Sequence, residues 1–74
     1  MTKMATKTAE RYENYYKAWL FAFNEKAPGE KQEKLLMSVD LLETILVNDC
    51  KLGYNGVAKI RQKAIDEFYA DLAK

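Results

Sequence analysis

The chain has 74 residues, a net charge of +1, one cysteine and no histidine. This length allows one small domain, and the charge balance gives no dense basic surface of the kind that nucleic acids or anionic membranes attract. The missing histidine excludes Cys/His zinc sites and nucleophile chemistry of the Ser-His-Asp or Cys-His type, and the single cysteine, Cys50, excludes an intramolecular disulfide, which fits a reducing cytosol.

Glycine and proline interrupt the chain at only two places, Pro28-Gly29 and Gly53 to Gly56. The three segments that result repeat their apolar residues with the period of a helix. We therefore expect an all-α three-helix bundle with short loops, in which residues 1–7 form a flexible N-terminus and residues 8–74 form a single domain. The expected helices cover residues 8–26, 30–52 and 56–73. No apolar run approaches the roughly 18 residues of a membrane span, and the start of the chain has no signal-peptide pattern, so we expect a cytoplasmic protein.

The first segment carries most of the aromatic residues on one helical face. With Thr8 as the expected N-cap and about 100° per residue, that face holds Tyr12, Tyr15, Tyr16, Trp19, Leu20 and Phe23. Core packing is the simplest interpretation of this stripe. Phe21 points to the opposite side, among polar residues, and has Ala18 and Ala22 on its flank. Two alternatives stay open for Phe21, which are contact with a partner and burial by another part of this chain.

The second segment has a wide apolar face, made of Leu35, Val39, Leu41, Leu42, Ile45 and Leu46. Leu36, Met37 and Val47 fall outside the centre of this face. A central helix that touches two neighbours needs such a broad stripe, and a second apolar surface used for association is the alternative. These surplus positions favour a homodimer, because the longest helix would expose Met37 or Val47 if it protruded. Gly53 is the expected left-handed stop.

The third segment, with Asn55 as the expected N-cap, directs an apolar face inward that holds Val57, Ile60, Ala64, Ile65, Phe68 and Leu72. Arg61 falls within this stripe, and Asp49 falls near the centre of the stripe on the second segment. We expect Arg61 and Asp49 to pair across the junction between the two helices. The alternative is that Arg61 contacts a partner.

The stretch "ILVNDCKLGYNGVAKIRQKAI" combines a helix, a glycine turn and a basic helix, as in helix-turn-helix proteins. Aligned on Gly53, however, the motif places Asp49, Lys59 and Gln62 where its two helices should pack together. The alignment therefore fails at the packing positions. A DNA-binding helical dimer remains an alternative, because a basic face of the third helix could reach phosphates through Lys59, Arg61, Gln62 and Lys63.

Signatures of catalysis are missing from the sequence. The carboxylate pairs Glu30/Glu33, Asp40/Glu43 and Asp66/Glu67 have the spacing of solvated helix faces, and "LGYNG" is too sparse in glycine for a phosphate loop. We expect no enzyme activity, no cofactor and no metal site. Cys50 is expected to be a small apolar filler.

The expected function is that of a small non-enzymatic protein-interaction module. Such a module would act as a regulator or inhibitor that docks sterically on a larger protein or complex, with apolar anchors and Tyr or Arg at the rim. Small regulators of this kind are common in phages and mobile elements, an origin that no residue here shows. A small structural or assembly subunit is a further alternative. The expected contact residues are Phe21, Met37, Val47, Tyr54, Arg61 and Tyr69.

Overall fold

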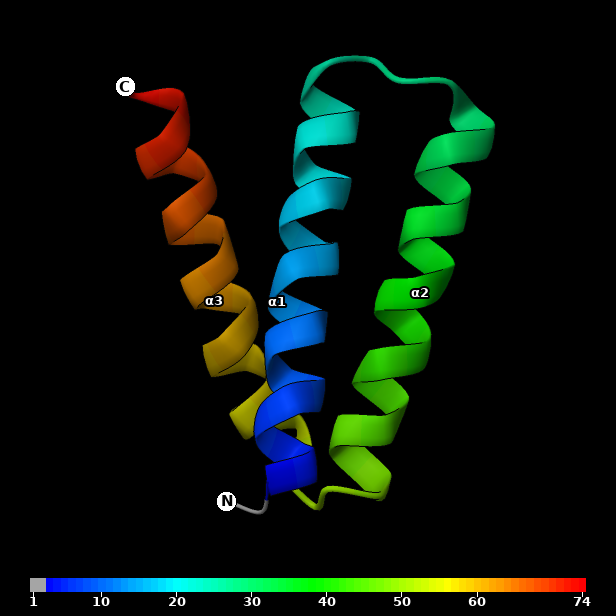
Figure 1. Ribbon diagram of the computed structural model, residues 1–74, viewed down its shortest axis with the longest axis vertical. Helices are drawn as coiled ribbons and strands as arrows, with labels where there is room; N and C mark the ends of the chain where they lie inside the picture. The colour runs from blue at the N-terminus through cyan, green and yellow to red at the C-terminus, as the bar shows by residue number, and fades with distance from the viewer. Residues whose placement is uncertain (1–2) are drawn as a thin grey trace.

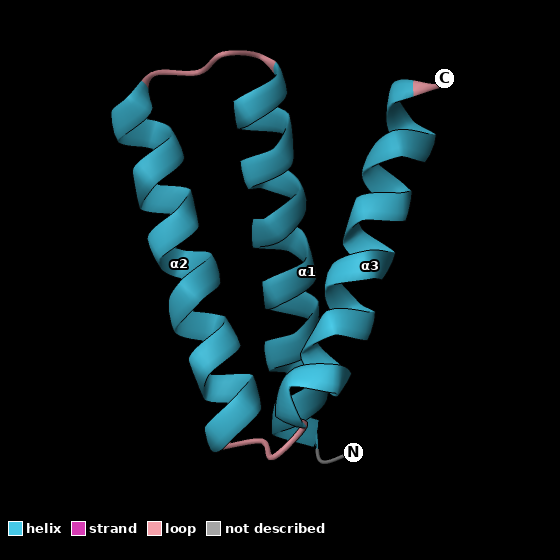
Figure 2. Ribbon diagram, turned by 180° about the vertical axis from the view of Figure 1, so that it is seen from behind, coloured by secondary structure: helices cyan, strands magenta, loops and turns pink. Residues whose placement is uncertain are grey.

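Three helices make up the computed structural model, which describes residues 3–74: α1 (Lys3–Asn24), α2 (Gly29–Asn48) and α3 (Gly53–Leu72). Figure 1 shows them packed side by side and joined by two short loops, so the expected three-helix bundle is confirmed. Figure 2 shows only helix and loop over the part of the chain that is described. None of these helices is apolar over enough of its length to cross a membrane.

The helix boundaries differ from those expected. The prediction of a flexible segment over residues 1–7 is wrong from Lys3 onward, because α1 already begins there, while Met1 and Thr2 lie outside the described residues. Thr8 is consequently an interior helix residue and not an N-cap. Asn55 is also interior, because α3 begins at Gly53. The expected ends at residues 26, 52 and 73 are late, and the observed ends are Asn24, Asn48 and Leu72.

Two lysines in left-handed backbone conformation explain why α1 and α2 end early. Lys26 has a φ of 55° and Lys51 a φ of 56°. After α1, the amide of Ala27 donates to the carbonyl of Ala22 at 2.9 Å and the amide of Lys26 donates to that of Phe23 at 3.2 Å. This is the hydrogen-bond pattern of a Schellman motif, which satisfies the last carbonyls of a helix. Gly53 also has a positive φ, 70°, but the chain has left α2 before it.

Helix α1 lies between α2 and α3 in both views (Figures 1 and 2). The central helix is therefore the first one, and the expectation that the second segment is central is wrong. Helices α2 and α3 approach each other near the loop that joins them, here named the converging end, and separate toward the C-terminus, here named the diverging end (Figure 1). The molecule is flattened, with extents of 34 × 28 × 19 Å.

The core follows from this arrangement. Tyr12, Leu46 and Val57, one from each helix, are completely buried, and Ala9 and Val39 complete the central cluster. A row of aromatic rings runs along α1 from Tyr12 toward the diverging end, and its members are Tyr12, Tyr16, Trp19 and Phe23. The centroids of successive rings in this row are 5.8, 5.7 and 6.1 Å apart. Its last ring is 64% exposed, because α2 and α3 have separated at that level.

Candidate protein-interaction surface

Arg61 lies in a polar cluster that joins all three helices. Its Nε donates to the hydroxyl of Tyr12 at 3.3 Å, its Nη2 lies 3.3 Å from Oε1 of Glu43, and the Tyr12 hydroxyl donates to Oε2 of Glu43 at 3.2 Å. An intramolecular pair for Arg61 is thus present, but its partner is Glu43. The prediction that Arg61 pairs with Asp49 is wrong, because Asp49 is exposed at the end of α2.

The protonation states in this cluster are fixed by its geometry. Burial raises the pKa of Tyr12, so the phenol stays protonated and donates a hydrogen bond to Glu43. The hydrogen bond to Tyr12 raises the pKa of Arg61 further above its already high ordinary value, so the guanidinium stays charged. The cluster satisfies the hydroxyl of a completely buried tyrosine. These contacts give Arg61 a structural reason for its position.

The other members of the basic face of α3 are also engaged within the chain. Gln62 donates to Asp66 at 3.0 Å, and the ammonium of Lys63 lies 3.8 Å from a carboxylate oxygen of Glu13. Of the four residues expected to reach nucleic acid, only Lys59 has no ion pair or side-chain hydrogen bond among the described residues. Neighbouring carboxylates therefore offset most of the positive charge on this face.

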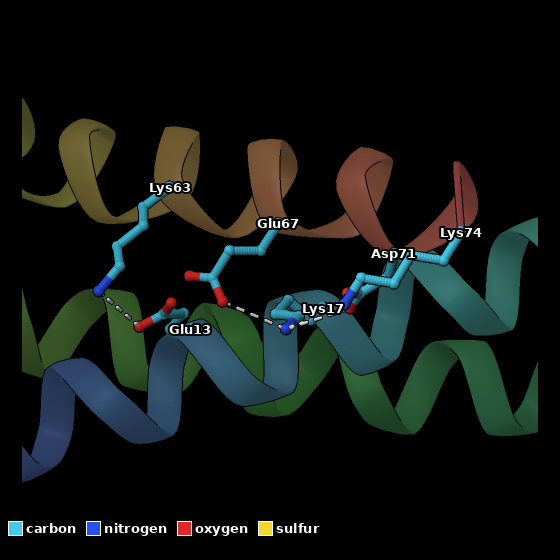
Figure 3. Close-up of polar contacts among 6 residues, drawn as sticks. All are labelled: Glu13, Lys17, Lys63, Glu67, Asp71 and Lys74. Atoms are coloured by element: carbon cyan, nitrogen blue, oxygen red, sulfur yellow. Dashed lines mark hydrogen bonds and ion pairs between the residues drawn. The ribbon is translucent and has the colours of Figure 1, made fainter.

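A charged cluster holds α1 against α3 (Figure 3). Lys17 lies at its centre, with its ammonium 3.3 Å from Glu67 and 3.6 Å from Asp71. Lys74 lies 3.8 Å from Asp71, and Glu13 with its partner Lys63 completes the row. Such partly exposed pairs are individually weak, but several together fix how two helices are aligned along their length.

Glu13 and Glu67 meet within this cluster as two carboxyl groups. Hydrogen bonding with the neighbouring Glu67 carboxyl raises the pKa of Glu13, and the same interaction lowers the pKa of Glu67. Oε1 of Glu67 is buried and has no hydrogen-bond donor among the described residues. A proton on Glu13 would supply such a donor.

Two of the expected contact residues are partly buried. The ring of Phe21 packs edge-on against that of Phe68, with centroids 4.8 Å apart. Of the two alternatives for Phe21, the structure therefore agrees with burial by another part of this chain. Val47 packs against the central core cluster, so the expectation that it is exposed is wrong. Phe21 is covered because α1 is the central helix, so the face of α1 that was expected to meet water meets α3 instead.

The remaining expected contact residues are exposed on different parts of the surface. Met37 is 65% exposed, Tyr54 75% and Tyr69 64%. Tyr54 lines a hollow of about 280 Å³ together with Val47. Tyr69 leans on Phe68, with ring centroids 5.3 Å apart. Because Tyr54 and Tyr69 are separated by about four turns of α3, they belong to separate patches.

Sequence reasoning missed a groove between α1 and α2, which we name the Arg11 groove. It encloses about 500 Å³ and is lined by Arg11, Tyr15, Ser38, Leu41 and Leu42. Leu41 was expected in the core but is 63% exposed, and Tyr15 is 42% exposed. A signal for this groove was present in the sequence, since Met37 and Leu41 lie about 40° apart on the helix and an outward Met37 therefore implies a nearly outward Leu41.

Comparisons of this chain with known protein families, with characterised proteins and with solved structures gave no match. Among the described residues, no three acidic, histidine or cysteine side chains gather as a metal site would require. The fold defines the class of this protein as a small all-α three-helix bundle. Its function has to be inferred from the surface that the bundle presents.

Proposed function

We propose that the protein is a small non-enzymatic interaction module that regulates or inhibits a larger protein or complex by docking on it. One observation supports this proposal above all others. Among the described residues, five large apolar side chains remain 63% to 75% exposed although the core is complete without them, and they are Phe23, Met37, Leu41, Tyr54 and Tyr69. Single exposed apolar residues are ordinary, but neighbouring ones, such as Met37 and Leu41 one turn apart on α2, are typical of surfaces that bind other proteins.

The mechanism in this proposal is steric. Exposed tyrosine, methionine and phenylalanine side chains are the usual anchors of protein interfaces, and a rigid helical scaffold presents them at little entropic cost. Absence of enzyme activity is part of this proposal, and it is supported by the composition, because a chain without histidine excludes nucleophile chemistry of the Ser-His-Asp and Cys-His types. A cytoplasmic site of action belongs to the same proposal, because the lone Cys50 leaves no second cysteine for an intramolecular disulfide. A phage or mobile-element origin is a general expectation for regulators of this size.

A protein partner has more support than the two alternatives. Nucleic-acid binding through α3 would need side chains that are now paired, namely Arg61 with Glu43 and Lys63 with Glu13. A homo-oligomer or assembly subunit would use the same exposed apolar residues, so self-association has to be measured alongside partner binding.

Affinity capture from a native lysate, followed by mass spectrometry, tests the proposal. The wild-type chain is compared with Met37→Lys, Tyr54→Lys and Tyr69→Lys, and with Asn14→Lys as a control at an exposed polar position. We expect one larger protein to be captured in a fixed ratio, retained by Asn14→Lys and lost in at least one of the other variants. Capture of DNA instead, or sedimentation that shows only self-association, would contradict the proposal.

A further inference from the structure

The Arg11 groove combines an apolar floor with a cation that has no ion-pair partner among the described residues. Tyr15, Leu41 and Leu42 provide the apolar lining, and Met37 lies one turn from Leu41 on α2, 65% exposed. Arg11 is exposed at the rim, and no carboxylate of the described residues lies within ion-pair distance of it. Arginine, tyrosine and methionine are enriched at the centres of protein interfaces.

The shape of the groove follows from the helices that form it. Helices α1 and α2 are antiparallel neighbours (Figure 1), and the groove is lined by about one turn of each, from Arg11 to Tyr15 on α1 and from Ser38 to Leu42 on α2. A helix laid in such a groove makes contact through residues spaced three and four apart. Its apolar residues would cover Leu41 and Tyr15, and a side chain one turn further along would reach Arg11.

The charge of the lining determines the chemistry of the occupant. The groove holds one cation and no carboxylate. A two-fold contact places the same patch on both subunits, so a second copy of this chain would bring Arg11 into the contact twice, and the residues that line the groove supply no carboxylate to pair with it. A nucleic acid would need several cations instead of a single one beside an apolar floor. A carboxylate on another protein would pair with the guanidinium.

We infer that the Arg11 groove is the docking site for an acidic amphipathic helix of the partner protein. This inference rests on the proposed function and adds to it the surface used and the chemistry of the segment that binds there. The partner helix places apolar side chains against Leu41, Tyr15 and Met37 and a glutamate or aspartate against Arg11.

The test uses two synthetic peptides of about 16 residues, each held helical by a hydrocarbon staple, with leucine at every third or fourth position. One peptide carries glutamate at the flanking positions and the other carries lysine. Binding to the full chain is measured by fluorescence anisotropy. The variants are Arg11→Glu and Leu41→Lys, and the controls are Lys59→Glu and Leu72→Lys, which make the same changes of charge at exposed residues on α3.

We expect the acidic peptide to bind at least tenfold more tightly than the basic one. Arg11→Glu and Leu41→Lys should each weaken that binding at least tenfold, while the two controls stay within twofold of the wild type. Equal binding of the two peptides, no binding, or equal effects of Arg11→Glu and Lys59→Glu would overturn the inference. A wild-type dimer that Leu41→Lys converts to a monomer would assign the groove to a second copy and overturn it too.

The same variants separate this inference from the proposed function. If the partner captured from lysate is retained by Arg11→Glu and Leu41→Lys but lost by Tyr54→Lys or Tyr69→Lys, the docking role stands and the groove assignment is wrong.

Discussion

Arg61 donates a hydrogen bond to the hydroxyl of Tyr12 at 3.3 Å, which links the third helix to the most deeply buried ring of the first. Glu43 on α2 completes the cluster, so three polar contacts join all three helices beside the core. Because three residues far apart in the sequence must all be in place to form it, this cluster reports directly on the tertiary structure.

Tyr12→Phe should lower the free energy of unfolding by about 1.5 kcal/mol, because it removes the two hydrogen bonds that the hydroxyl makes with charged groups and leaves Arg61 paired with Glu43. Arg61→Met should cost more, about 2 kcal/mol, because Glu43 then keeps its charge without a cation nearby. Urea denaturation measures both values, and the double variant gives the coupling between them. Tyr54→Phe is the control and should have no effect, since that side chain is 75% exposed. Additive effects in the double variant would show that the cluster is not a unit.

Phe21 should contribute more to the stability of the fold than Phe23, although only Phe23 belongs to the aromatic stripe of α1. Phe21→Ala should cost about 2 kcal/mol of unfolding free energy, because the ring packs edge-on against Phe68. Phe23→Ala should cost less than about 1 kcal/mol, because its ring is 64% exposed and touches only Trp19 among the aromatic residues described. Thermal and chemical unfolding of the two variants decide the order, and a larger loss for Phe23→Ala would contradict the packing described for the diverging end.

Lys26→Gly should raise the free energy of unfolding by about 1 kcal/mol. Lys26 has a φ of 55°, a conformation that is strained for any residue with a Cβ and free of strain for glycine. Lys51→Gly, at a φ of 56°, should act in the same direction. Lys59→Gly is the matched control within α3 and should lower stability by about 1 kcal/mol. A loss of stability in all three variants would mean that neither loop lysine is strained.

The opposite pKa shifts of Glu13 and Glu67 should make stability depend on pH in two opposite ways. The pKa of Glu13 is raised, so its contribution is full below the ordinary value of 4.5 and is lost as the pH rises through its folded pKa. The pKa of Glu67 is lowered, so its contribution is present above 4.5 and is lost as the pH falls through its folded pKa. For this pair, stability should therefore be greatest near pH 4.5.

Glu13→Gln tests this balance, because the amide donates to Glu67 at any pH. The variant should be more stable than the wild type near neutral pH, and the difference should shrink as the pH falls toward 4.5. Urea midpoints at several pH values measure this difference. Glu10→Gln, at an exposed position one turn away, is the control. A difference that does not change with pH would show that the two carboxyls share no proton.

The sequence by itself determined the number of helices, their approximate positions and much of the core. Helical periodicity and two clusters of glycine and proline were sufficient, because both are local properties of the chain. Val39, Leu46, Val57 and Phe68 were expected inside and are buried. The expected exposure of Met37, Tyr54 and Tyr69 also agrees with the structure.

Only the tertiary structure decided which helix is central and hence which apolar residues are covered. With α1 between its neighbours, Phe21 and Val47 turn inward, whereas Leu41 and Phe23 stay exposed. The partner of Arg61 and the groove beside Arg11 depend on the same choice. A periodic pattern gives each helix an apolar face but does not state its neighbours, since the relative rotation and crossing of helices are set by contacts between residues far apart in the chain.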